Sequence, residues 1–146
     1  METPRGRWEW TGYGQTDRGL VRSSNQDAFL VDNRRRLWAV ADGMGGHPGG
    51  DVASRIVMDT LADFSPSLIR SAVPPGEDQG EQQSFLLTTM AEQAHAAVRA
   101  YADHHPPFYG MGTTLVMAHL LPEPTPRLLV LNVGDSRAYL VRAGRI

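Results

Sequence analysis

Residues 37–50 read LWAVADGMGGHPGG, and the expected fold is built outward from them. The apolar run Leu37–Ala41 has the length and composition of a buried strand, and it stops at Asp42 before a glycine-dense turn. Gly43 follows Asp42, and because it has no β-carbon its backbone carbonyl can face whatever Asp42 binds. Hard divalent cations prefer carboxylate and carbonyl oxygens as ligands. This stretch therefore predicts half of a magnesium or manganese site at a strand end.

Composition limits the class of protein. The 146 residues suffice for one modest domain, and 41% apolar with 21% charged residues is typical of a soluble globular fold. A formal net charge of −2 provides no basic field, so neither nucleic acid nor an anionic membrane is expected as a partner. The absence of cysteine excludes disulfides, thiolate zinc sites and phosphatases with a cysteine nucleophile. No signal peptide or bilayer-spanning run is visible, so a cytoplasmic location is expected.

The residues before position 37 predict two strands and a polar loop. Trp8–Gln15 alternates aromatic and polar residues, as a half-buried strand does. Residues 16–27 are rich in turn formers, and Ala28–Val31 predicts a second strand. Residues 32–36 predict a tight turn that returns the chain into the Leu37 strand as a hairpin. The three arginines of that turn are most simply solvated.

Two helices are expected after the glycine-rich turn. Apolar residues at three- and four-residue spacing from Asp51 to Phe64 predict an amphipathic helix, which Pro66 ends. Residues 71–83 are polar and without periodicity, so they predict a surface loop. A second helix is expected from Ser84 to about His104. The residues expected to share one face of it are Phe85, Met90, Ala94, Ala97, Val98 and Tyr101.

The last third of the chain predicts three more strands. They are Met111–Ala118, Leu128–Val133 and Arg137–Arg142, followed by a turn at Ala143-Gly144. Helices grouped together between strands, instead of alternating with them, favour an α+β layered fold with mainly antiparallel sheets. No internal repeat or linker is visible, so residues 1–146 are expected to belong to a single domain.

Four blocks of sequence, in order and at matching spacing, resemble the bacterial type of the metal-dependent PP2C (PPM) serine/threonine phosphatases. The blocks are RSSNQD at 22–27, ADGMGGH at 41–47 with Gly50 and Ala53-Ser54 behind it, MGTTLV at 111–116, and NVGDSR at 132–137. This resemblance implies a four-layer α-β-β-α sandwich of mainly antiparallel sheets, of which the chain is an incomplete N-terminal part. It also implies a binuclear Mg²⁺ or Mn²⁺ site at one edge.

The resemblance assigns roles to five residues. Asp42 resembles the carboxylate that bridges the two metals, and the carbonyl of Gly43 resembles a ligand of the second metal. Asp27 resembles the residue that holds metal-bound water. Arg22 resembles the arginine that grips the substrate phosphate, and its planar fork suits two phosphate oxygens. Asp135 resembles the ligand of a third metal that bacterial members often bind.

Other interpretations of the same residues stay open. Asp42 could be a turn former, Arg22 a solvated loop residue, and Asp135 an aspartate that bonds local amides. His47, before a proline, is most simply a turn residue, and Thr113 with Thr114 is interpreted as sheet packing.

Two positions depart from the family pattern. Gln26 stands where many members have glutamate, so it can accept a hydrogen bond but adds no charge. Met44 stands where animal members have a histidine proposed as general acid, and a thioether has no proton to donate. Bacterial relatives share this methionine, so water held by the metals is expected to protonate the leaving group.

The family also supplies at least two metal-binding aspartates, in an Asp-Gly and an Asp-Asn block, from a C-terminal half that has no counterpart in these 146 residues. The expected function is therefore that of the N-terminal portion of a metal-dependent protein phosphatase, inactive alone. Its substrates would be proteins phosphorylated by a serine/threonine kinase, and its cofactors two or three Mn²⁺ or Mg²⁺ ions. The alternative is a non-catalytic, phosphatase-like module that binds phosphoproteins or regulates a second polypeptide.

Overall fold

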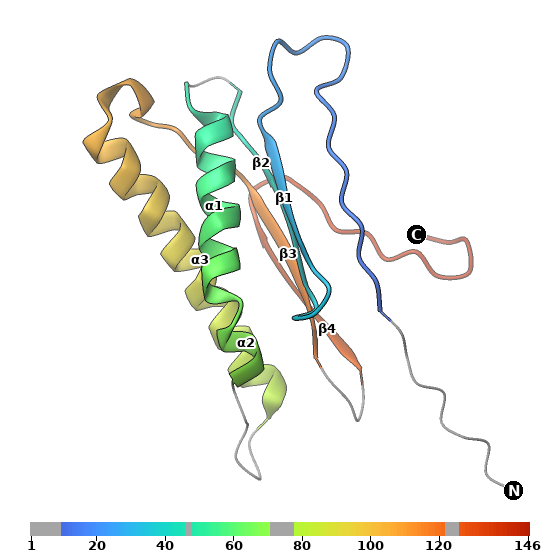
Figure 1. Ribbon diagram of the computed structural model, residues 1–146. Helices are drawn as coiled ribbons and strands as arrows, with labels where there is room; N and C mark the ends of the chain where they lie inside the picture. The colour runs from blue at the N-terminus through green and yellow to red at the C-terminus, as the bar shows by residue number, and fades with distance from the viewer. Residues whose placement is uncertain (1–9, 46–47, 71–77, 122–125) are drawn as a thin grey trace, which may run out of the picture.

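The computed structural model of the protein describes residues 10–45, 48–70, 78–121 and 126–146. One antiparallel sheet, in the order β1-β2-β3-β4, carries two long helices on one of its faces (Figure 1). This arrangement confirms the expected α+β class, and it supplies one sheet layer and one helix layer of the four that the resemblance implies. The elements in chain order are β1 (Asp27–Asp32), β2 (Leu37–Asp42), α1 (Gly50–Phe64), α2 (Ser67–Arg70), α3 (Gln79–His104), the 3-10 helix η1 (Pro106–Phe108), β3 (Leu115–Leu121) and β4 (Arg127–Val133).

Strands β1 and β2 form the predicted hairpin. Their register runs from Asp32 opposite Leu37 beside the turn to Asp27 opposite Asp42 at the far end. Asp32 holds the turn, because its carboxylate accepts the Arg35 backbone N–H at 2.9 Å and pairs with the Arg35 guanidinium at 2.7 Å. The expectation that all three turn arginines are solvated is therefore wrong for Arg35. A pinned turn fixes which residues meet at the opposite end of the hairpin.

The core lies between the helices and the sheet. Alternate residues of β2 are buried because successive side chains of a strand point to opposite faces. Helix α1 packs on β1 and β2, and α3 packs on α1, β3 and β4, as the expected amphipathic patterns require. Residues that are almost completely buried in this core are Leu37, Ala53, Leu61, Leu87, Met90, Ala94 and Met117.

The other face of the sheet remains apolar and exposed. Val40 is 48% exposed, Leu128 52% and Val130 50%, although all three lie in strands. The sequence suggested a buried strand at 37–41, and the structure corrects this to a strand buried on one face only. Gly12 lies against the ring of Trp38 and Gly14 against that of Phe29, so the segment before β1 crosses part of this face.

Two expected strands are absent from the described residues. Residues 10–15 form no strand. The backbone of Gly12 bonds the Asn33 side chain instead, with its N–H donating to Oδ1 at 2.7 Å and its C=O accepting from Nδ2 at 3.2 Å. Trp8 and Glu9 lie outside the described residues. Arg137–Arg142 also forms no strand; its last residue bridges Arg145 across the expected turn at Ala143-Gly144. Alternation indicates strand character, but a strand forms only beside a partner edge.

The boundaries of the remaining elements differ from the expectation at three places. Helix α3 begins at Gln79 rather than Ser84, because Asp78 caps it by accepting the Gly80 N–H at 2.7 Å. The expected loop is therefore wrong over 79–83, while 71–77 lie outside the described residues. Phe85 was expected on the buried face of this helix but is 70% exposed, and Leu87 is buried in the core instead. Strand β3 begins at Leu115, and the short α2 was not predicted.

In the part of the chain that the structure describes, no helix is both long enough and apolar enough to cross a bilayer.

Candidate active site

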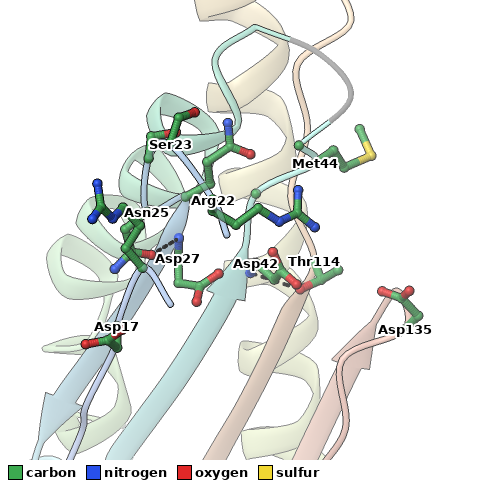
Figure 2. Close-up of a pocket in the computed structure, with 14 residues that line it drawn as sticks. Asp17, Arg22, Ser23, Asn25, Asp27, Asp42, Met44, Thr114 and Asp135 are labelled. Atoms are coloured by element: carbon green, nitrogen blue, oxygen red, sulfur yellow. Dashed lines mark hydrogen bonds between the residues drawn. The ribbon is translucent and has the colours of Figure 1, made fainter. Parts of the chain in front are cut away.

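An open pocket of about 450 Å³ lies at the edge of the sheet where β1 begins and β2 ends. Asp27 and Asp42 are register partners there, and Figure 2 shows their carboxylates facing one another. All five predicted site residues line this pocket, so the fold brings them together. The complete lining is Asp17, Arg18, Arg22, Ser23, Ser24, Asn25, Gln26, Asp27, Asp42, Gly43, Met44, Gly45, Thr114 and Asp135.

Acidic side chains outnumber basic ones in the lining of this pocket. Burial raises the pKa of Asp42 above its ordinary value, and so do the charge and hydrogen bond of Asp27 and the charge of Asp135, whereas the charge of Arg22 lowers it. A carboxylate surrounded by other carboxylates resists ionisation until a positive charge arrives. The arrangement therefore favours a bound cation.

Thr114 holds the backbone of Asp42 from the neighbouring chain segment. The N–H of Asp42 donates to Thr114 Oγ1 at 3.1 Å, and the N–H of Thr114 donates to the Asp42 carbonyl at 2.9 Å. Thr114 Oγ1 also lies 2.6 Å from Ser136 Oγ, next to Asp135. The interpretation of Thr114 as sheet packing is therefore incomplete, because it lines the pocket and positions the central carboxylate.

Asp27 is positioned by the polar loop that precedes it. Its N–H donates to Asn25 Oδ1 at 3.0 Å, and Thr16 Oγ1 lies 3.4 Å from its Oδ2. The Asn25 amide in turn donates to Thr16 at 2.9 Å. Sequence reasoning did not assign roles to Asn25 or Thr16, although Asn25 belongs to the RSSNQD block that carried the resemblance.

The glycine-rich turn leaves room for close approach. A β-carbon on Gly43 would collide with the backbone carbonyl of Gly50 and would lie 2.8 Å from that of Gln26. One on Gly45 would lie 2.8 Å from Nη1 of Arg22, so the guanidinium rests directly against this turn. The turn thus joins the phosphate-gripping candidate Arg22 to the strand end that carries Asp42.

The oxygen atoms of the pocket are of the type that a hard cation prefers, but few of them lie close together. The paired carboxylates of Asp27 and Asp42, with the carbonyl of the pocket-lining Gly43, are oxygen ligands of the preferred kind. Asp135 stands farther off, beyond the end of β4 (Figure 2). Across the described ranges, no three acidic or histidine side chains come close enough together to hold a metal ion. The described residues thus offer a cation two paired carboxylates and one carbonyl. His47 lies outside the described residues.

The sequence model of the family described as Protein phosphatase 2C matches residues 12–146, and the chain belongs to that family. It is 36% identical over 132 residues to serine/threonine protein phosphatase PstP of Mycobacterium tuberculosis, covering 90% of this chain and 23% of the relative. It is also 36% identical over 131 residues to serine/threonine phosphatase stp of Listeria innocua, covering 88% of this chain and 48% of the relative. The chain therefore spans about half or less of the length of these relatives.

Solved structures agree with this family assignment. The crystal structure of the catalytic domain of PstP in complex with two manganese ions matches with a TM-score of 0.68 and 36% identity. The match covers 89% of this chain and 50% of the other. The fold described above thus corresponds to about half of that catalytic domain.

Proposed function

We propose that residues 1–146 are the N-terminal part of a single PPM-type domain, truncated at its C-terminal side, of a metal-dependent phosphatase. The whole protein would hydrolyse phosphoserine and phosphothreonine monoesters in phosphorylated proteins. The observation that carries the proposal is the pairing of Asp27 with Asp42 in one pocket with Arg22. The names of the relatives and the manganese complex of PstP support the same reaction.

Asp42, Asp27 and the Gly43 carbonyl would hold two Mn²⁺ or Mg²⁺ ions, with Asp135 available for a third. When bound, such ions screen the phosphate charge and supply a water that is deprotonated near neutral pH. Arg22 would bind the phosphate, because its guanidinium lies against Gly45 at the pocket wall and its fork can hold two oxygens. Thr114 keeps Asp42 in place for this task. Met44 lines the pocket without a proton to donate, so it is no general acid.

The exposed apolar face of the sheet supports the four-layer arrangement. A contiguous apolar face of this kind normally packs on another layer. We propose that a second sheet, supplied by the rest of the protein, covers Phe29, Val40 and Val130 and brings further metal ligands to the pocket edge. The incomplete ligand set of the described residues then explains why residues 1–146 alone would be inactive.

The same incomplete ligand set favours one other function. A phosphatase-like module that keeps Arg22 but lacks a full metal centre would bind phosphoproteins without hydrolysing them. Tight binding of a phosphopeptide without turnover by the protein from the complete gene would support this module and contradict the enzyme.

The test compares phosphate release from a phosphothreonine peptide by the protein expressed from its complete gene, with Mn²⁺ and with a chelator. We expect metal-dependent release, reduced at least about a hundredfold by Asp42→Asn or Asp27→Asn. Asp59→Asn is the matched control, since Asp59 is exposed on α1 and outside the pocket. Release that persists in Asp42→Asn would contradict the proposed site. Release by purified residues 1–146 would contradict their proposed inactivity.

A further inference from the structure

A second cavity, of about 310 Å³, adjoins the acidic pocket and has a mainly apolar lining. It reaches the core, because Val57 of α1, Ala94 and Val98 of α3, and Leu115 of β3 line it and are all buried. Its lining includes none of the acidic residues of the first pocket and not Arg22. We refer to it as the Met44 cavity.

Met44 forms the wall between the two pockets and lines both. Its N–H donates to the carbonyl of Gly112 at 2.9 Å, and its terminal methyl would collide with a β-carbon on Gly112. Met44 is 46% exposed, and its side chain extends away from Asp27 and Asp42 in Figure 2. Met44 is therefore the residue at which a peptide bound in the acidic pocket can continue into the Met44 cavity.

The rim of the Met44 cavity carries the positive charge of Arg99. Arg99 lies one turn after His95 on α3, and both residues are exposed and line the cavity. In the described ranges, no carboxylate lies within 4.0 Å of the Arg99 guanidinium, although Asp103 follows one turn later. An unneutralised cation beside an apolar cavity suits a ligand that combines an apolar side chain with an acidic one.

We propose that the Met44 cavity binds an apolar side chain of the phosphorylated protein, close to the phosphoresidue; this inference rests on the proposed phosphatase function. An acidic residue next to that side chain pairs with Arg99. Burial of a leucine side chain in such a cavity should make a leucine-containing phosphopeptide bind about tenfold more tightly than one with glycine at that position. The Met44 cavity would thus select among phosphoproteins, while the acidic pocket acts on any phosphate monoester that reaches it.

The test uses the protein from the complete gene and a panel of fluorescent phosphothreonine peptides. Leucine followed by aspartate is placed at successive positions on either side of the phosphothreonine, and glycine-asparagine replaces the pair in the matched peptides. Peptide binding is measured by fluorescence anisotropy, and hydrolysis in parallel. At one position we expect the leucine-aspartate peptide to bind about tenfold more tightly than its match.

Two variants locate the effect. Ala91→Phe fills the Met44 cavity from α3 and should abolish the leucine preference, whereas Ala96→Phe, exposed on the same helix and outside the cavity, should keep it. Arg99→Glu acts at the exposed rim without disturbing the core, and it should weaken binding of the aspartate peptide by roughly threefold. Arg34→Glu, in the β1–β2 turn, is its charge control.

Equal affinity for leucine and glycine peptides at every position would overturn the inference. So would an unchanged leucine preference in Ala91→Phe, or a fall in thermal stability of that variant without any peptide preference, which would show that the rest of the protein fills the cavity. Failure of the proposed function looks different. In that case the leucine preference persists, but phosphorylated and unphosphorylated peptides bind equally well and no phosphate is released.

Discussion

Thr114 bonds both backbone polar groups of Asp42, because its Oγ1 accepts the Asp42 N–H at 3.1 Å and its own N–H donates to the Asp42 carbonyl at 2.9 Å. The two residues lie 72 positions apart in the chain. The carboxylate at the centre of the candidate site therefore depends on a hydroxyl from another segment.

Replacing Thr114 tests this positioning role. Thr114→Val keeps the shape but leaves the Asp42 N–H without its acceptor, so we expect the Mn²⁺ concentration for half-maximal activity to rise about tenfold. Thr114→Ser restores the hydroxyl and should restore most of the metal affinity. A merely structural role would instead lower the thermal stability of Thr114→Val without changing the metal requirement.

Gly43 and Gly45 should respond differently to alanine. A β-carbon on Gly43 meets backbone atoms of Gly50 and Gln26, which cannot move independently, so Gly43→Ala should destabilise the fold by about 1–3 kcal/mol. The β-carbon of Gly45→Ala meets only side-chain ends, those of Arg22 and Gln26, among the described residues. We expect little loss of stability there and weaker phosphopeptide binding. Urea unfolding and peptide titration of both variants measure this, and equal destabilisation by the two would contradict it.

Asp42→Asn should stabilise the metal-free protein at neutral pH. Because the pKa of Asp42 is raised on folding, the folded state binds its proton more tightly than the unfolded state, and stability falls as the pH rises from the ordinary aspartate pKa through the raised one. The amide removes this cost, which we expect to be below about 1 kcal/mol for a partly exposed group. Thermal unfolding with a chelator measures the gain, and the gain should vanish in acid. Asp59→Asn should show no such pattern.

His119 should make stability depend on pH near neutrality. It is 4% exposed, and burial is the main cause that lowers its pKa. The Arg36 carbonyl, 3.1 Å from Nδ1, favours protonation, whereas the Arg36 charge opposes it. The backbone of Arg35 also favours protonation of the ring, but burial outweighs both backbone contributions to the pKa.

The sign follows from the lowered pKa. The unfolded chain takes up the His119 proton first, so the stability that the neutral ring provides is present above about pH 6.5 and is lost as the pH falls. His119→Asn keeps a donor for the Arg36 carbonyl and cannot titrate. We expect it to flatten the slope of stability between pH 7 and pH 5. An unchanged slope in urea unfolding at these pH values would contradict the role of His119.

Sequence patterns within a few residues predicted the elements that depend mainly on neighbouring residues. The turn at 32–36, the strand that ends at Asp42 and the helix from Gly50 to Phe64 all follow from turn chemistry and periodicity within a few residues. The start of α3 was missed because its cap, Asp78, sits in a polar stretch without periodicity. The strand expected at 8–15 is absent over its described residues 10–15, and the strand expected at 137–142 is absent too, because alternation does not reveal whether a partner edge exists.

The candidate site divides in the same way. The sequence by itself determined the ligand chemistry, since Asp42 beside Gly43 at a strand end and the four motif blocks already indicated a divalent-cation phosphatase site. Only the tertiary structure decided that Asp27 faces Asp42, that Thr114 holds Asp42, and that Met44 separates an acidic pocket from an apolar one. The physical reason is that residue types fix which atoms can bind a cation. Strand register and packing between distant segments fix which of those atoms meet.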